Sequence, residues 1–273
     1  MDLKHIMDLK HIINLEEYPL DQALVEKTRE KLKKDSVVLL PNFLQLDVLQ
    51  SLVKEAESIQ DQAFCRRMNH SVYLKPSNQS LAPDHIFNRQ VVTSKGCVTT
   101  DQIPCNSYLK ELYYNLEFQQ FLENVLGVEK LHDYQDPLSS ITIHYGCEGQ
   151  ELGWHFDNSA FAITLLLQKP EAGGIFEYIS NVREENSTHF GFNDEIRKEC
   201  IQDVEQILDG EMPPKQLEFN AGTLVLFRGR DSLHRVSKVI ENTKRILVVL
   251  AYNEVPNVRL PDETMMTFFG RTA

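Results

Sequence analysis

The residues most able to do chemistry lie in two short segments. His155 and Asp157 stand two residues apart in GWHFDNS, and His234 follows in DSLHRVSKV. On a β-strand, residues i and i+2 point to the same face, so an imidazole and a carboxylate at this spacing converge. Two histidines and one carboxylate are typical ligands of non-haem iron(II), and they leave coordination positions open. The spacing therefore predicts a metal site made by His155, Asp157 and His234.

A candidate anion-binding residue follows the second histidine. Arg245 lies eleven residues after His234, in the apolar segment KRILVVLAYN. A guanidinium can hold a carboxylate through two parallel hydrogen bonds, and apolar neighbours strengthen that contact by excluding water. We therefore expect Arg245 to bind an acidic ligand near the metal. A structural ion pair with Glu218 or Glu254 is the alternative.

The segments around these residues change character along the chain. In 13–130, amphipathic patterns predict helices at 21–34, after Asp47, and between Ser107 and Gly127, with one buried strand in SVVLLPNFL. In 131–255, short β-rich runs separated by Gly, Pro and Asn predict an antiparallel sandwich or barrel, interrupted by a helical insertion near 181–209. We expect an α+β fold in one domain, 13–273, whose helical N-terminal half packs on a β core and which ends in a segment at 256–273.

The start of the chain contains a duplication. MDLKHI occupies positions 1–6 and again 7–12. A perfect repeat that begins with Met is typical of an alternative start or a cloning artefact. We therefore expect residues 1–12 to lie outside the fold.

Composition limits the classes of function. The net charge is −12 and no long run of Lys or Arg occurs, which argues against a nucleic-acid partner. The five cysteines are scattered and odd in number, which favours a reducing compartment. No apolar run is long enough to span a bilayer, and the N-terminus lacks a secretory signal. We expect a cytoplasmic protein with a small-molecule partner, and the sequence leaves open whether it forms a homodimer.

The order of the motifs resembles the iron(II)/2-oxoglutarate-dependent oxygenase superfamily. HFD is followed by GGIFEYI, GTLVLFRGRDSLHRV and KRILVVLAY, within residues 140–253. FEYISNVR and the helix-rich N-terminal half are further similar to a group that acts on free amino acids and contains lysine hydroxylases and radical halogenases. The resemblance implies a double-stranded β-helix (jelly-roll, cupin-like) core that uses Fe(II), 2-oxoglutarate and O2.

The resemblance also implies a reaction. Halogenases of this group carry a small residue in place of the ligating carboxylate, so that chloride can bind the iron. Asp157 fills that position here, which implies hydroxylation of an unactivated carbon in a free amino acid, such as lysine, with release of succinate and CO2.

Further roles are carried over from the resemblance. Arg245 would hold the distal carboxylate of 2-oxoglutarate, and Thr164 would add a hydroxyl contact. The residues expected to bind substrate are Arg89, His144, Tyr145, Asn158 and Asn253. The plainer alternatives are a solvated surface arginine at position 89 and a core histidine at position 144.

Two other functions compete with this interpretation. The same oxygenase chemistry could act on another small metabolite or on a protein side chain. A non-catalytic metal-binding β-barrel is the alternative outside enzymes.

Overall fold

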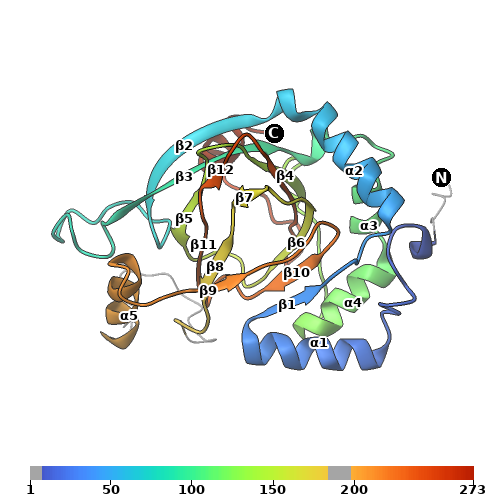
Figure 1. Cartoon of the computed structure of the whole chain (residues 1–273), viewed down its shortest axis with the longest axis horizontal. Coiled ribbons are helices and arrows are strands. Elements are labelled where there is room, and N and C mark those ends of the chain that lie inside the picture. The colour runs from blue at the N-terminus through green and yellow to red at the C-terminus, as the bar shows by residue number, and fades with distance from the viewer. Residues whose placement is uncertain (1–7, 184–197) are drawn as a thin grey trace.

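The computed structural model describes residues 8–183 and 198–273, and its strands are arranged around a common axis (Figure 1). The large sheet has the order β1-β10-β6-β13-β4-β3-β2, and the small sheet has the order β5-β11-β8-β9. Every pairing is antiparallel, which confirms the expected α+β fold with a jelly-roll core. The strands of the large sheet are β1 (Val37–Leu40), β10 (Leu224–Phe227), β6 (Ala162–Gln168), β13 (Arg245–Leu250), β4 (Ile141–Gly146), β3 (Gln90–Val98) and β2 (Phe64–Ser71). The small sheet contains β5 (Leu152–His155), β11 (Leu233–Val236), β8 (Phe176–Ile179) and β9 (Lys215–Leu217), and β12 (Val239–Ile240) pairs separately with β7 (Ala172–Gly173).

Helices cover the outer face of the large sheet (Figure 1). They are α1 (Gln22–Asp35), α2 (Leu46–Ser58), α3 (Tyr108–Tyr113) and α4 (Leu116–Leu126), and short 3-10 turns occur at Leu9–His11, Gln60–Gln62 and Thr100–Gln102. Local capping explains the ends of two of them. Asp21 accepts a hydrogen bond from the Leu24 amide at the start of α1, and Gly127 ends α4 with a φ of 73°, a conformation that glycine adopts without strain. The helices expected at 21–34 and between Ser107 and Gly127 are therefore present, whereas Asp47 lies inside the first turn of α2 rather than at its cap.

Side-chain alternation separates the two faces of the large sheet. Ile141, Ile143 and Tyr145 of β4 belong to the main core, which lies between this sheet and the helices. On the opposite face, Val225 and Phe227 of β10 cluster with Tyr178 of the small sheet. Residues 142 and 144 of β4, and 245, 247 and 249 of β13, therefore face the barrel interior.

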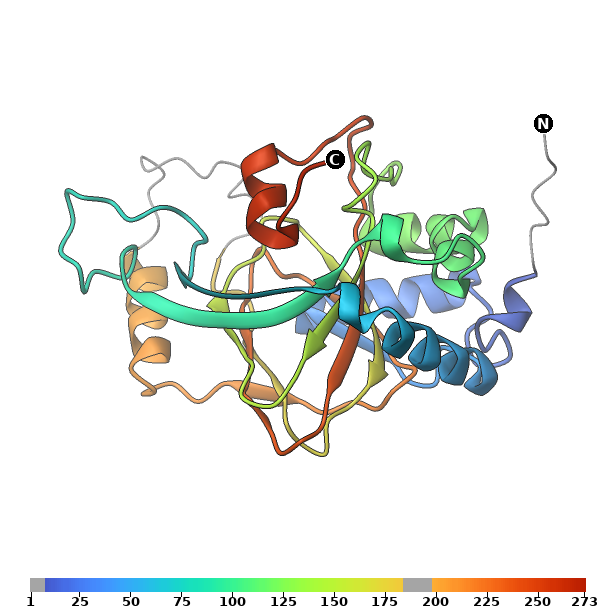
Figure 2. The same cartoon turned by 90° about the horizontal axis from the view of Figure 1, so that it is seen from above.

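The N-terminal half supplies more sheet than the sequence predicts. The expected strand in SVVLLPNFL is β1, and it pairs with β10. The segment at 64–105, which has little periodicity, forms the hairpin of β2 and β3 at the edge of the large sheet (Figure 2). Because β2 is an edge strand with many exposed residues, it lacks the apolar alternation that would reveal it.

The expectation for the duplicated start is wrong for its second copy. Residues 9–11 form a 3-10 turn, and Leu9 and Ile12 are buried in the main core. Ile13 continues this contact by bridging to Leu44. The second copy of the repeat therefore belongs to the fold, because its apolar side chains are buried next to the N-terminal end of α2. Residues 1–7 lie outside the described part of the chain.

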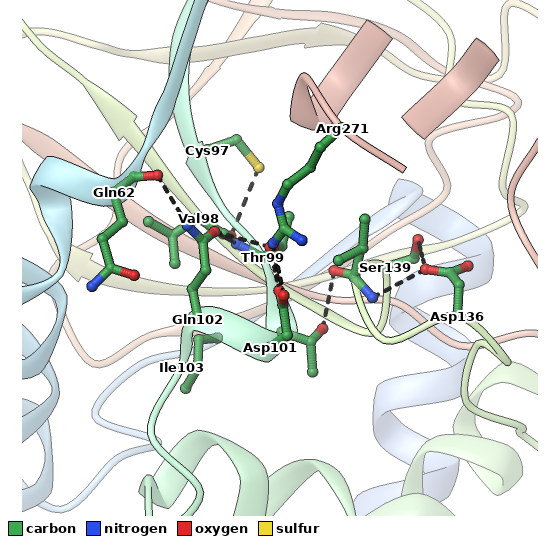
Figure 3. Close-up of polar contacts among 12 residues, drawn as sticks. Gln62, Cys97, Val98, Thr99, Asp101, Gln102, Ile103, Asp136, Ser139 and Arg271 are labelled. Atoms are coloured by element: carbon green, nitrogen blue, oxygen red, sulfur yellow. Dashed lines mark hydrogen bonds and ion pairs between the residues drawn. The ribbon is translucent and has the colours of Figure 1, made fainter. Parts of the chain in front are cut away.

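The C-terminal segment is tied to the end of β3. Helix α6 (Asp262–Phe269) buries Met265 against Cys97 and Leu138. Beyond it, Arg271 donates hydrogen bonds to Thr99 and to both carboxylate oxygens of Asp101 (Figure 3). Residues 256–273 therefore close one side of the β core rather than trailing from it.

The described part of the insertion after β8 packs on the outer face of the small sheet. Its described helix, α5 (Lys198–Leu208), packs Val204 and Ile207 into a cluster with Trp154 and Leu233. Residues 184–197 of the expected insertion lie outside the described residues. No helix in the described part of the chain combines the length and apolar character needed to cross a bilayer.

Candidate metal and cosubstrate site

The two histidines predicted to bind metal are neighbours across a strand pair. His155 ends β5, and it lies directly opposite His234 of β11. Their ring centroids are 4.2 Å apart. Asp157 follows β5, and its Oδ1 lies 3.6 Å from the Nε2 atom of each histidine. One ligand atom from each of the three residues lies within 4.8 Å of the other two, so one cation with bonds of roughly 2.1 Å can be reached by all three after small adjustments.

Backbone carbonyls orient both imidazoles. Nδ1 of His155 lies 2.8 Å from the Gly153 carbonyl oxygen, and Nδ1 of His234 lies 3.0 Å from that of Ser232. A carbonyl only accepts hydrogen bonds, so each Nδ1 carries the proton and each Nε2 offers a lone pair toward Asp157. In this tautomer, Nε2 of each histidine is unprotonated and can bind a metal ion.

Electrostatics favour a cation at the same point. Burial, followed by neighbouring His234, lowers the pKa of His155 to about 3, so this imidazole is neutral at neutral pH. Burial tends to raise the pKa of Asp157, but His234 and His155 outweigh it and the pKa falls to about 2. The site therefore holds an ionised carboxylate beside an imidazole lone pair, which fits a divalent metal ion.

Gly229 leaves the space that the Asp157 carboxylate occupies. A Cβ atom added at Gly229 would lie 1.8 Å from Asp157 Oδ2, and the Gly229 carbonyl accepts a hydrogen bond from the Asp157 amide at 3.0 Å. The backbone at Gly229 is not in the left-handed region, so only the side-chain space requires glycine. Sequence reasoning missed this residue, although its place in FRGRDSLH, five residues before His234, was a signal.

Arg245 is buried at the start of β13 and faces the interior. Burial lowers its pKa to about 10, which leaves the guanidinium charged at neutral pH. Among the described residues it makes no hydrogen bond or ion pair, and Glu218 lies instead 3.8 Å from Lys169. Arg245 reaches a cavity of about 240 Å³ that is also lined by Leu166, Gly174 and Phe176. A buried cation without a protein partner is suited to an anionic ligand.

Thr164 also faces the interior, but at a different level. It pairs with Val249, four residues along β13 from Arg245, which corresponds to roughly 13 Å. A contact of both residues with one carboxylate would require the long arginine side chain to lean along the strand. The role of Thr164 in cosubstrate binding stays a prediction, and the register favours contact with a different part of the ligand.

His144 and Tyr145 face opposite sides of β4, so the two cannot both line the pocket. Tyr145 is 1% exposed in the main core, and its hydroxyl donates to the Ala56 carbonyl at 2.7 Å. The predicted substrate role of Tyr145 is therefore wrong, because adjacent residues on a strand point in opposite directions. His144 is the inward residue.

Arg89 is committed to another contact. Its guanidinium forms an ion pair with Asp209 at 2.6 Å and donates to the Leu208 carbonyl at the end of α5. These bonds join the β2–β3 hairpin to α5, which lie side by side (Figure 2). The predicted substrate contact of Arg89 is not supported, because these partners already occupy the charged group.

The two asparagines lie near one tyrosine. Asn158 is exposed just after Asp157, and its carbonyl accepts hydrogen bonds from Arg230. Asn253 forms a backbone bridge with His132. The Tyr134 hydroxyl interacts with the side chains of Asn253 and Ser159, although burial still raises the pKa of Tyr134. Tyr134, which sequence reasoning missed, thus links Asn253 to the loop that follows the metal ligands, and substrate binding by either asparagine stays a prediction.

Lys95 is a second interior cation that the sequence did not reveal. It lies on β3, and its Nζ is 3.1 Å from both ring nitrogens of His144. Burial lowers its pKa, while the charge of Asp157 acts in the opposite direction. Among the described residues, the interior therefore brings together two basic side chains, Lys95 and Arg245, and the carboxylate of Asp157.

The comparison with protein families agrees with this geometry. Residues 20–270 match the model of the family described as Halogenase D. The chain belongs to the Halogenase D family.

Solved structures similar to this Halogenase D family member share its fold at low sequence identity. The carbocyclase SnoK, non-haem and 2-oxoglutarate (alpha-ketoglutarate)-dependent, from nogalamycin biosynthesis, has a TM-score of 0.56 at 12% identity, covering 91% of this chain and 92% of SnoK. A 2OG-Fe(II) oxygenase family oxidoreductase from Burkholderia pseudomallei has a TM-score of 0.53 at 12% identity, covering 88% and 95%. A prolyl hydroxylase from Trichoplax adhaerens has a TM-score of 0.54 at 12% identity, covering 90% and 96%. No curated protein sequence matches significantly.

These findings define the type of enzyme. The Halogenase D match shows an enzyme family, the similar structures show the fold, and His155, Asp157 and His234 form a cluster that could hold a metal ion.

Proposed function

We propose that this protein is an iron(II)- and 2-oxoglutarate-dependent hydroxylase of a free amino acid, with a basic one such as lysine as the leading candidate. One observation carries the proposal: three side chains that could hold a metal ion converge inside a barrel, which also buries an arginine that has no partner within residues 8–183 and 198–273. A metal ion satisfies the first feature and a dicarboxylic cosubstrate satisfies the second.

The candidate site residues have two separate roles, metal binding and cosubstrate binding. His155, Asp157 and His234 would hold iron(II), and Arg245 would hold the distal carboxylate of 2-oxoglutarate. Bound together, the metal and cosubstrate reduce O2 and oxidise a substrate carbon, with release of succinate and CO2. Phe176 and Phe227 pack against His234 at ring-centroid distances of 5.6 and 4.9 Å, so they exclude water from one side of the site.

Asp157 favours hydroxylation over halogenation. Its carboxylate is directed at the two histidines, and Gly229 leaves room for it. An anionic side chain in this position occupies the place that a chloride ion would need. The family name describes a halogenase, so this residue is the specific reason to propose the other outcome.

The substrate class rests on resemblance. FEYISNVR and the helix-rich N-terminal half resemble a group that acts on free amino acids, and the net charge of −12 mildly favours a cationic substrate. The partner is therefore proposed as a small molecule, not a nucleic acid.

A mass-spectrometric screen tests the proposal. The protein is incubated with iron(II), ascorbate and 2-oxoglutarate, with and without chloride, against each of the twenty amino acids. We expect one added oxygen atom in one amino acid, coupled to succinate. A chlorinated product would overturn the assignment of Asp157.

The competing functions give different results. Substrate-independent consumption of 2-oxoglutarate without any modified amino acid would favour another metabolite or a protein side chain. Absence of oxygen uptake with metal bound would favour a non-catalytic barrel and would overturn the enzyme.

A further inference from the structure

Two cations stand on either side of one glycine in the barrel wall. Arg245 of β13 lies opposite Gly146 of β4. On the other side of β4, Gly96 of β3 pairs with Tyr145, so the register brings Lys95 next to Gly146 as well. Residues opposite one another across strands point to the same face, so Arg245 and Lys95 both face inward at the same level. Two strand spacings, roughly 10 Å, separate their backbones.

Gly146 itself places no side chain between these two residues. A Cβ atom at Gly146 would be in ordinary contact with Val239 and Arg245, at 3.5 and 3.6 Å. No side chain therefore stands between Lys95 and Arg245 on this strand.

The contacts of Lys95 leave part of its ammonium group unused. Nζ is equally far, 3.1 Å, from Nδ1 and Nε2 of His144, and the Thr142 hydroxyl lies 3.2 Å from that same Nε2. The pKa of His144 is held well below its usual value by burial and by Lys95 and Arg245, so the ring is neutral. A neutral imidazole can accept one hydrogen bond from the ammonium, which has three donors.

Lys95 has no ion-pair partner among the described residues. Within residues 8–183 and 198–273, no Asp or Glu oxygen forms an ion pair with Lys95, although Asp157 is close enough for its charge to influence the lysine. An ammonium buried without an anionic partner is costly. The arrangement is therefore suited to a bound anion on the metal-facing side of the pocket.

We propose that Lys95, oriented by His144, binds the 2-oxo acid carboxylate of the cosubstrate, while Arg245 binds its distal carboxylate. This inference rests on the proposed function, because it assumes that 2-oxoglutarate is the dianion in the pocket. Lys95 is then a positioning residue: it fixes the end of the cosubstrate that faces the metal ligands. Two cations of opposite placement also make the pocket selective for a dicarboxylate over a monocarboxylate.

The test compares two ligands that differ by one carboxylate. 4-Oxobutanoate lacks the 2-oxo acid carboxylate of 2-oxoglutarate and keeps the distal one. Dissociation constants of both are measured by calorimetry, under anaerobic conditions, for iron-loaded wild type, Lys95→Met, Lys95→Arg and the control Lys238→Met, whose side chain is 58% exposed.

We expect Lys95→Met to weaken 2-oxoglutarate binding by about 10-fold or more, since a charge-assisted hydrogen bond is lost. Binding of 4-oxobutanoate should change by less than about 3-fold, because that ligand has no group for Lys95. Lys95→Arg should recover part of the loss, and Lys238→Met should match wild type.

Two results would overturn the inference. Equal weakening of both ligands would mean that Lys95 acts only through the structure, and unchanged 2-oxoglutarate binding would mean that it does not touch the cosubstrate. If wild type itself binds iron but no 2-oxoglutarate, the proposed function fails first. The wild-type titration therefore separates the two failures.

Discussion

Charged and polar side chains have different partners on the inner and outer faces of the barrel. On the outer face of the small sheet, Arg235 pairs with buried Glu177 and stacks on Trp154, with its guanidinium carbon 4.7 Å from the ring centroid. On the inner face, Arg245 is more deeply buried, yet among the described residues it has no acidic partner. The difference teaches that burial alone does not mark a functional cation; a missing partner does.

The same contrast holds on neighbouring residues of one strand. Tyr145 points outward and satisfies its hydroxyl on the Ala56 carbonyl, whereas His144 points inward and meets the ammonium of Lys95. The outward group, Tyr145, forms a hydrogen bond within the core. The inward groups, His144 and Lys95, are available to bind a ligand.

The largest effect is expected at the only anionic metal ligand. Asp157→Ala should lower iron(II) affinity by more than about 100-fold and abolish turnover, because two neutral imidazoles bind a divalent cation weakly. Equilibrium dialysis against iron(II) measures the affinity, with Asp61→Ala, an exposed acid, as the control. Wild-type iron affinity in Asp157→Ala would show that the carboxylate ligand lies elsewhere.

The two arginines give the sharpest test of the comparison. Arg245→Met should weaken 2-oxoglutarate binding by about 100-fold or more, and it should leave the metal-free protein as stable as wild type or more stable, since an unpaired buried charge is removed. Arg235→Met should do the reverse. It should leave 2-oxoglutarate binding unchanged and destabilise the protein by about 1–2 kcal/mol, because it strips buried Glu177 of its cation.

Calorimetry and denaturant unfolding check both halves of that reversal. A loss of stability in Arg245→Met as large as in Arg235→Met would remove the distinction between the two faces.

An intermediate effect is expected at Gly229. Gly229→Ala should lower iron(II) affinity by about 10-fold, because the new methyl group overlaps the position of Asp157 Oδ2. In an Asp157→Gly background the same substitution should have no further effect, since the overlap is gone. Additive losses in the double variant would mean that Gly229 acts through the backbone rather than through the carboxylate.

The smallest effect is expected on the outer face. Tyr145→Phe should cost about 1 kcal/mol of unfolding free energy through loss of the bond to Ala56, with no change in the KM for 2-oxoglutarate. Urea unfolding and steady-state kinetics measure the two quantities. A raised KM for 2-oxoglutarate would show that Tyr145 does line the pocket.

The sequence predicted the parts of the site that periodicity or motif order can report. His155 and Asp157 share a strand-like spacing, and the opposition of His155 to His234 follows from the jelly-roll order of strands. Arg245 was found because it follows His234 at the start of an apolar strand. These signals are local, so one sequence contains them.

What the sequence did not predict depends on three-dimensional pairing. Lys95 lies in an edge hairpin with little apolar alternation, and only the register with β4 brings it beside His144. The ion pair between Arg89 and Asp209 of the α5 region was not predicted, because the two residues lie more than a hundred positions apart in the sequence. Arg89 was therefore assigned to the substrate. Tyr145 was assigned to the pocket although strand alternation already separates it from His144.

One titration tests the central claim most directly: 2-oxoglutarate is added under anaerobic conditions to wild type and to Arg245→Met, each loaded with iron(II), and the absorbance of the metal–2-oxo acid complex is recorded. We expect a saturable signal at one cosubstrate per chain in wild type, and a midpoint shifted by about 100-fold in the variant. Identical curves for the two proteins, or no signal from iron-loaded wild type, would contradict it.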